Sequence, residues 1–317
     1  MNPDSWGGPV WNKLWKFGIL GFFCAQCVGC AGNRSEESAE PLKSPVYGEK
    51  HLLWKAEKSG APAVWLLGSI HLADSSFYPL PAILDSALDA STLVAAELDI
   101  NKSETVQKTG MLMAEKGALP AGTFLKDVLP DSLLNRVDSL LAAWKIPKEI
   151  MAPFRPWMVA LSLSALAIER SGLSGDFGID QEILARAEDL GKKIFALETP
   201  EEQIGIFSNA EDSLGIEYLQ STLNEILEAD SFVRDMATAW KTGDVEKMRR
   251  LLDSDSSESA YEEELYVKRN VRMANAIDSL AALGEEPFIV VGCAHLVGSG
   301  DNVLRLLEKK GYRIRQR

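Results

Sequence analysis

The sequence predicts an α/β fold with a mostly parallel sheet that carries long helical insertions. Four continuous apolar runs are typical of strands buried on both faces, and they cover residues 63–70, 92–100, 192–199 and 287–294. Segments with the helical spacing of Leu, Val, Ile and Ala separate these runs, as expected for parallel strands joined by crossover helices. Two of the connections are much longer than one helix needs, which predicts the helical insertions.

The other elements follow from the same patterns. Residues 51–71 are predicted to form two strands around a turn at Ser59 and Gly60, because turn residues interrupt the apolar pattern there. A helix-sized segment at residues 80–91 separates the first two buried runs. Apolar spacing predicts the remaining helices at residues 129–144, 156–169 and 178–191, within 199–284, and at 301–311, before a short final strand at 312–316.

The N-terminus has the pattern of an export signal. Lys13 and Lys16 precede an apolar run of 13 residues, 17–29, which is too short to cross a bilayer as a helix. A small residue then precedes Cys30, and this arrangement resembles the lipoprotein box in which the Cys is lipidated and becomes the new N-terminus. An ordinary cleavable signal and an uncleaved apolar anchor are the alternatives.

This pattern divides the chain into three parts. We expect a lipoprotein-type signal peptide at 1–29, a flexible tether at 30–45 and a folded domain at 46–317. The chain is then an exported, membrane-anchored lipoprotein. In a Gram-negative host, Ala31 after the lipidated Cys resembles the sorting signal for the periplasmic side of the outer membrane.

Composition and charge limit the possible partners. Among the 317 residues, 46% are hydrophobic and 25% are charged, which is typical of a globular protein that buries a sizeable core. The formal net charge of -13 argues against nucleic acid, because a phosphate backbone requires clustered Lys and Arg. Three of the four cysteines lie in the apolar leader, so only Cys293 remains and no internal disulfide framework is expected.

Two of the three histidines repeat one pattern at strand ends. His71 and His295 each follow an apolar run in a G-x-x-H arrangement, and Glu97 lies near the end of another run. Ligands of parallel α/β sheets bind beyond the carboxyl ends of the strands, so these side chains converge if the strands are neighbours. Two imidazoles and a carboxylate suit a catalytic divalent ion such as Mn, Co or Zn, which activates water for hydrolysis. The alternative is that both histidines are structural.

Other polar residues beside the strand runs are candidates for the same site. Asp180 and Glu198 are candidates for a second carboxylate or for orienting the other nitrogen of a histidine, although helix capping explains Asp180 equally well. Arg155 and Arg269 are candidates for binding an anionic group of a substrate. Each of these arginines fits a structural ion pair as an alternative.

Three more residues are considered because of their neighbours. Asp99 is predicted to share a strand face with Glu97, so either carboxylate is a candidate to face the site, and Cys293 is predicted to share a face with His295 in the same way. We expect Cys293 to be a small buried residue, with a soft metal ligand or a nucleophile as the alternative. His51 has no companion and is expected at the surface.

These residues carry a resemblance to a known family. The chain contains, in order, "LLGSIHLAD" with "YPLP", "AELD", "FGID", "ALET" followed by "EQ", "KRN" and "VVGCAHLVG", which span residues 64–298. The set resembles the TraB/GumN family, which includes the TIKI-type proteases. The resemblance implies an erythromycin-esterase and ChaN-like α/β fold with the paired histidines and the Glu at one site. By similarity these are His71, His295 and Glu97.

Residues and resemblance together lead to one main hypothesis and two alternatives. The main hypothesis is a membrane-tethered, metal-dependent hydrolase that acts on a peptide or protein substrate, with the histidines as ligands and Glu97 as a ligand or general base. TIKI-type members are metal-dependent proteases, whereas TraB-like bacterial members block peptide pheromones. The first alternative is therefore a noncatalytic peptide-binding lipoprotein, and the second is an envelope scaffold.

Overall fold

The structure is a computed structural model that describes residues 45–252 and 266–317. The predicted signal peptide at 1–29, Cys30 and all but the last residue of the predicted tether lie outside the described residues. Within the described ranges, no helix has both the length and the apolar character needed to cross a bilayer.

The described residues form a six-stranded sheet in the order β4-β3-β5-β2-β1-β6. The strands are β1 (Leu53–Glu57), β2 (Val64–Ser69), β3 (Leu93–Ala96), β4 (Lys193–Ala196), β5 (Pro287–Gly292) and β6 (Arg313–Gln316). β4, β3, β5 and β2 are parallel, whereas β1 pairs antiparallel with both β2 and β6. The prediction of a mostly parallel sheet is therefore wrong, because the sheet is mixed.

A short turn between β1 and β2 explains why this part of the sheet is antiparallel. The predicted turn at Ser59 and Gly60 is confirmed, and it joins β1 to β2 with too few residues for a parallel crossover. Gly60 has a φ of 77°, a left-handed conformation that suits glycine. β6 pairs antiparallel with the other edge of β1, so it extends the hairpin that β1 and β2 form.

Within the described residues, seven helices and one of two short 3-10 helices, η2, place most of their buried apolar residues in the same hydrophobic core as the sheet. The core contains β5, in which every residue is buried, and β2, which is buried except for the partly exposed Trp65. The helices are α2 (Ala82–Asp89), α7 (Ile179–Asp189), α10 (Ala229–Thr242), α11 (Val245–Leu252), α13 (Lys268–Ala282), α14 (Cys293–Val297) and α15 (Val303–Lys309), with η2 (Ser75–Phe77) and η4 (Gly175–Phe177).

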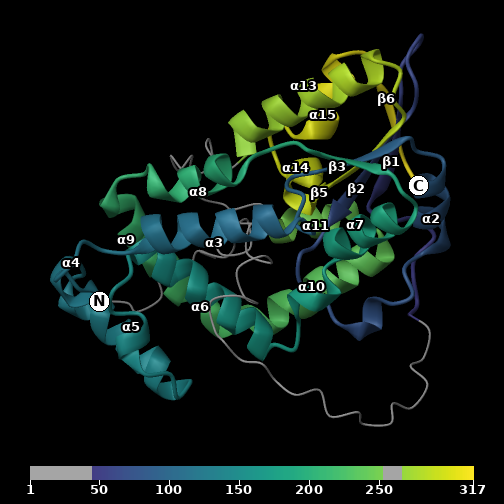
Figure 1. Cartoon of the computed structure of the whole chain (residues 1–317). Coiled ribbons are helices and arrows are strands. Elements are labelled where there is room, and N and C mark those ends of the chain that lie inside the picture. The colour runs from purple at the N-terminus through teal and green to yellow at the C-terminus, as the bar shows by residue number, and fades with distance from the viewer. Residues whose placement is uncertain (1–44, 253–265) are drawn as a thin grey trace, which may run out of the picture.

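The two helical insertions pack against each other around a second hydrophobic core. We call this part the helical unit; Figure 1 shows it beside the sheet, on the side opposite β1 and β6. Its elements are α3 (Ser103–Gly117), α4 (Leu125–Val128), α5 (Asp131–Ala143), η3 (Lys148–Ile150), α6 (Pro156–Arg170), α8 (Pro200–Ser208), α9 (Asp212–Glu225) and η5 (Ile226–Glu228). Because α6 and α9 come from different insertions and contact each other closely, the insertions form one layer.

Local sequence signals explain where the elements nearest the site begin and end. α8 begins with a capping box in which the Thr199 hydroxyl accepts from the backbone N–H of Glu202 and the Glu202 carboxylate accepts from that of Thr199. β5 ends at Gly292, and residues 293–297 form α14. The prediction that Cys293 and His295 share a strand face is therefore wrong, because both lie on a helix.

Candidate functional site

The parallel half of the sheet brings the predicted site residues to one edge. His71 lies two residues after β2, Glu97 follows β3 directly, Glu198 lies two residues after β4, and His295 lies on α14 just after β5. These strands are neighbours in the order β4-β3-β5-β2, and all four end at the same side. The candidate site therefore lies beyond the carboxyl ends of the strands, where α/β sheets bind ligands.

Asn270 sets the tautomer of His295. The Asn270 amide Nδ2 donates to the backbone oxygen of Asp301 at 3.1 Å, which turns its Oδ1 toward the imidazole. Oδ1 lies 2.7 Å from His295 Nδ1 and can only accept, so Nδ1 carries the proton. Nε2 of a neutral His295 then has a free lone pair.

The surroundings of His295 favour this neutral form. Burial, together with the positive charges of Arg269 and His71, holds the pKa of His295 well below its usual value of 6.5. Nε2 lies 3.8 Å from Oε1 of Glu97, and the Tyr266 ring packs at 5.5 Å between centroids. His295 is therefore a fixed, neutral imidazole whose Nε2 lone pair lies beside the buried carboxylate of Glu97.

His71 is held by a carboxylate rather than by an amide. Its Nδ1 lies 2.6 Å from Oδ2 of Asp180 on α7, while its Nε2 is buried and has no hydrogen-bond partner among the described residues. Burial opposes the charged imidazolium, but the carboxylates of Asp180 and Glu97 outweigh burial and raise the pKa of His71 to about 9. Without a competing cation, His71 is therefore protonated at neutral pH.

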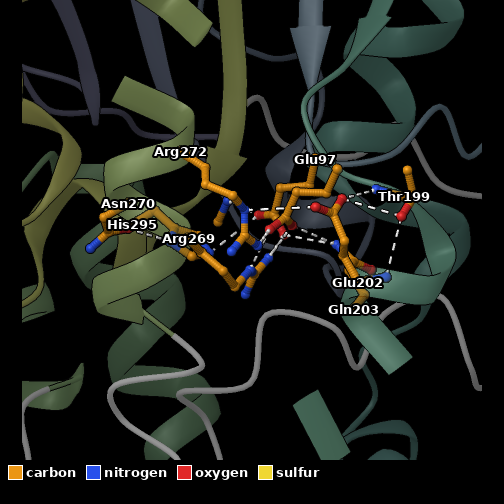
Figure 2. A network of polar contacts seen from close by, with 10 residues as sticks. Glu97, Thr199, Glu202, Gln203, Arg269, Asn270, Arg272 and His295 are labelled. Carbon is orange, nitrogen blue, oxygen red and sulfur yellow. Dashed lines mark hydrogen bonds and ion pairs between the residues drawn. The ribbon is translucent and has the colours of Figure 1, made fainter. Parts of the chain in front are cut away.

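A buried arginine connects the two glutamates of the site. Arg269 donates from Nε to Oε1 of Glu198 at 2.7 Å, and from Nη2 to Oε2 of Glu198 and to Oε2 of Glu97, both at 2.6 Å. Figure 2 shows the Arg269 guanidinium turned toward Glu97 and Gln203. These charges raise the pKa of Arg269 above its already high value, although burial alone would lower it. Arg269 thus compensates much of the negative charge that the sheet places here.

Two further donors complete the shell around Glu97. The backbone N–H of Gly292 donates to Oε1 at 2.8 Å, and the Gln203 amide on α8 donates to Oε2 at 3.3 Å and to Glu198 at 3.1 Å. Arg272 lies at the outer end of this network, 3.4 Å from Glu198, with its side chain half-exposed. Both oxygens of Glu97 therefore accept hydrogen bonds from the protein.

The residues meet part of what a divalent ion requires. Two ligands of a tetrahedral ion with bonds near 2.1 Å lie about 3.4 Å apart, close to the 3.8 Å between His295 Nε2 and Glu97 Oε1. Each histidine is oriented through Nδ1, as ligating histidines are, and Nε2 of His71 has no hydrogen-bond partner in the part of the chain that the structure describes. As placed, however, the described ranges contain no group of three or more His, Cys, Asp and Glu side chains close enough to hold a metal ion. The donor types fit a metal, and their spacing fits only after a local shift.

Several predicted candidates lie outside this network. Asp99 is buried and pairs with Lys102 at 2.9 Å; β3 ends before Glu97, so the prediction of a shared strand face does not hold. Arg155, at the N-terminus of α6, pairs with Asp212 at 2.8 Å. His51 is half-buried at the edge of the Tyr47 ring, and burial lowers its pKa.

Cys293 is a packing residue in this arrangement. Its Sγ would lie 3.0 Å from a Cβ placed at Gly68, so the thiol fills the space beside that glycine. Burial raises the pKa of the thiol strongly, which keeps it protonated. The expectation of a small buried cysteine agrees with this position, and a nucleophilic thiolate does not.

Sequence reasoning missed three polar residues of the site. Asn270, Gln203 and Arg272 received no role, although Asn270 directly follows Arg269 in the quoted "KRN" and Gln203 closes the quoted "EQ". Asn270 and Arg272 lie one and three positions after Arg269, and Gln203 lies five positions after Glu198. A helical spacing of three from Arg269 would have identified Arg272, and the capping motif after Glu198 would have drawn attention to Gln203.

The chain is similar in sequence to several known proteins. The chain is 25% identical to the protein named Uncharacterized protein YbaP of Escherichia coli (strain K12), over 79% of this chain and 91% of that protein. It is also 25% identical to Metalloprotease TIKI1 of Danio rerio, over 89% of this chain and 66% of that protein, and 23% identical to Metalloprotease TIKI2 of the same species, over 95% and 67%. No solved structure matches the chain.

A family model matches residues 52–316, which include every strand of the sheet and all the residues of the site. The match therefore covers the whole arrangement described above, from β1 to β6. The chain belongs to the TraB/PrgY/gumN family.

Proposed function

We propose that the chain is a metal-dependent hydrolase that cleaves peptides outside the cytoplasm, on a membrane to which Cys30 tethers it. The observation that carries this proposal is the pair of oriented histidines: Asp180 holds Nδ1 of His71 and Asn270 holds Nδ1 of His295. Nε2 of His71 has no hydrogen-bond partner within the described ranges, and Nε2 of His295 lies 3.8 Å from Glu97 Oε1. Similarity to proteins named as metalloproteases supports the reaction class. We also propose that the α/β fold of the chain is of the erythromycin-esterase and ChaN-like kind.

The residues divide the work as follows. His71 and His295 hold the ion through Nε2, and Glu97 is the third ligand or the general base. The chemistry that such an ion supplies when bound is polarisation of the scissile carbonyl and activation of water. Arg269 compensates the charges of Glu97 and Glu198, and Asp180 and Asn270 fix the two imidazole rings.

The test combines metal binding with peptide cleavage. The purified protein, stripped with a chelator, is titrated calorimetrically with Mn, Co and Zn, and a peptide library is incubated with and without each ion and analysed by mass spectrometry. We expect stoichiometric binding and metal-dependent cleavage. The double variant His71→Ala, His295→Ala should lose both, whereas His51→Ala, which changes the third histidine, should retain both. Equal metal affinity in the two variants would contradict the metal site.

One observation favours the alternative of peptide capture without catalysis. Oε1 of Glu97 accepts from the backbone of Gly292, and Oε2 accepts from Arg269 and Gln203, so three of the about four acceptor positions of the carboxylate are already occupied by the protein. The same experiment separates the two functions. Peptide binding without metal-dependent cleavage across a broad library would favour capture.

The proposed location rests on the N-terminal sequence. A single acyl chain binds membranes only marginally, but several chains on Cys30, each contributing about 0.8 kcal/mol per buried CH₂, anchor a protein stably. We expect Cys30→Ser to abolish lipid labelling and to release the protein from the membrane fraction or leave it unprocessed. An intact mass that corresponds to an unmodified Cys30 in the mature protein would exclude the lipid anchor and leave the metal site untouched.

A further inference from the structure

β4 is an edge strand of the sheet that is exposed on both of its faces. It pairs with β3 on one side and stands at the end of the strand order. Lys193, Phe195 and Ala196 are exposed and Ile194 is half-exposed, whereas the neighbouring β3 is completely buried. Phe195 keeps 42% of its surface exposed, which is unusual for a large apolar residue of a sheet.

The backbone of β4 leaves hydrogen-bonding groups free along this edge. The N–H of Leu197 donates to the backbone oxygen of Ala96 at 2.8 Å, so odd-numbered positions of this segment face β3. Successive residues of a strand alternate in direction, and the N–H and C=O groups of Ile194 and Ala196 therefore point away from β3. An extended chain placed there would find a row of donors and acceptors.

The opposite edge of the sheet differs in its side chains. β6 carries Arg313 and Arg315, and basic residues on an edge strand prevent unwanted pairing with another chain. The single basic residue of β4 is Lys193, at the end of the strand that lies farther from the site. The two edges are therefore not equivalent: β6 is protected by charge, while β4 presents an aromatic ring and a small residue.

β4 also runs directly into the candidate site. Immediately after it, the N–H of Glu198 donates to the backbone oxygen of Glu97 at 2.9 Å, and the Glu198 carboxylate binds Arg269. A segment bound along β4 would be guided toward the carboxyl ends of the strands, where the two histidines lie. The exposed edge therefore ends beside the buried network of Glu97, Glu198 and Arg269.

From these observations we propose that the edge of β4 binds an extended peptide segment, which adds to the sheet as a further strand. This inference rests on the proposed function, because it assigns the binding mode of the peptide that the site acts on. A second copy of this chain is the other possible occupant, but a strand of four residues pairs too little surface for a stable dimer. A peptide gains additional contacts from the site itself.

The test uses a fluorescein-labelled, end-blocked short peptide of alternating Val and Thr, measured by fluorescence anisotropy with the full chain in a chelator. Methylation of single peptide nitrogens removes one donor at a time. Strand addition predicts a period of two: methyl groups on nitrogens that face β4 weaken binding about tenfold or more, and those on alternate nitrogens leave binding unchanged. A flat methylation profile, or absence of binding by the unmodified peptide, would overturn the proposal.

Variants of the protein provide an independent readout. Ala196→Pro removes an outward N–H at an edge position that tolerates proline, and Phe195→Ala removes the apolar contact; each should weaken binding about tenfold. Leu283→Ala, which truncates an exposed apolar residue at the end of α13, should not. Unchanged binding by both Phe195→Ala and Ala196→Pro would contradict docking at β4. If Ala196→Pro does not fold, the methylation profile of the peptide decides whether strand addition occurs. A period of two without metal-dependent cleavage would retain the docking surface and reject the hydrolase.

Discussion

At the scale of single residues, the largest fully buried side chain in the described ranges is that of Arg269, which is charged. Its removal leaves the buried carboxylates of Glu97 and Glu198 without their shared cation. Loss of one partner of a buried ion pair destabilises a protein by about 3–5 kcal/mol. We expect Arg269→Met to lower the free energy of unfolding by that amount, measured by urea denaturation.

A matched control is available in the same chain. Arg155 also forms an ion pair, with Asp212, but both partners are partly exposed, so Arg155→Met should cost less than about 1 kcal/mol. Glu198→Gln, added to Arg269→Met, should recover part of the lost stability because it removes one uncompensated charge. Similar losses for the two arginine variants would contradict the buried network.

The pair of His71 and Asp180 predicts a pH-dependent stability of the metal-free protein. The pKa of His71 rises from 6.5 to about 9 on folding, so its stabilising contribution is complete below pH 6.5 and is lost as the pH rises through 9. This rise corresponds to about 3 kcal/mol. We expect Asp180→Asn to destabilise the protein most near pH 6.5 and least above 9.

The measurement is urea unfolding of both proteins in a chelator across this pH range. The difference between wild type and Asp180→Asn is the informative quantity, because other titrating groups cancel in it. A difference that stays constant with pH would show that Asp180 does not charge His71.

At the scale of elements, sequence patterns located the strands well but not their ends. The helices predicted at residues 129–144, 156–169 and 178–191 are confirmed as α5, α6 and α7. The apolar run at 287–294 does not reveal that the strand ends at Gly292, since short apolar runs look alike in helices and strands. That boundary decides which way His295 points, so its orientation could not be read from the sequence.

The contact between β2 and α14 predicts a coupled pair of substitutions. A Cβ at Gly68 would meet Cys293 Sγ at 3.0 Å, and overpacking of this kind costs about 1–3 kcal/mol. We expect Gly68→Ala to be destabilising by that amount, and Cys293→Ala to relieve most of the cost in the double variant. The free energies of unfolding form a double-mutant cycle, and additive effects would indicate that the backbone, not the thiol, limits the space.

At the scale of the whole molecule, the site closes only because the helical unit reaches it. Gln203 on α8 binds Glu97 from a position more than a hundred residues along the chain, while Arg269 and Asn270 enter from α13. The sequence indicated the strand-end residues because the sheet's own pattern brings them together. The capping motif marks the start of the helix that carries Gln203, but no periodicity encodes that the packing of the insertions on the sheet brings Gln203 to Glu97. Glu97 and His295 are consequently buried, so the proposed binding of a peptide at these residues requires a local opening of the elements around them.

This closure predicts how Arg272 affects access to the site. Arg272 on α13 lies 3.8 Å from Glu202 on α8 and 3.4 Å from Glu198, so it joins the helical unit to the sheet from a half-exposed position. Cys293 is buried beside Gly68 and is the single Cys after residue 30, so its rate of alkylation reports opening of this region.

We expect Arg272→Ala to speed alkylation of Cys293 severalfold in a chain that begins after Cys30, because the loss of a latch between the two cores favours local opening. Lys247→Ala, which breaks the pair with Asp235 between α10 and α11, serves as the control and should leave the rate unchanged. Urea unfolding of each variant separates local from global opening. An alkylation rate that follows only the global free energy of unfolding would mean that the two cores open together, and that Arg272 does not govern access to the site.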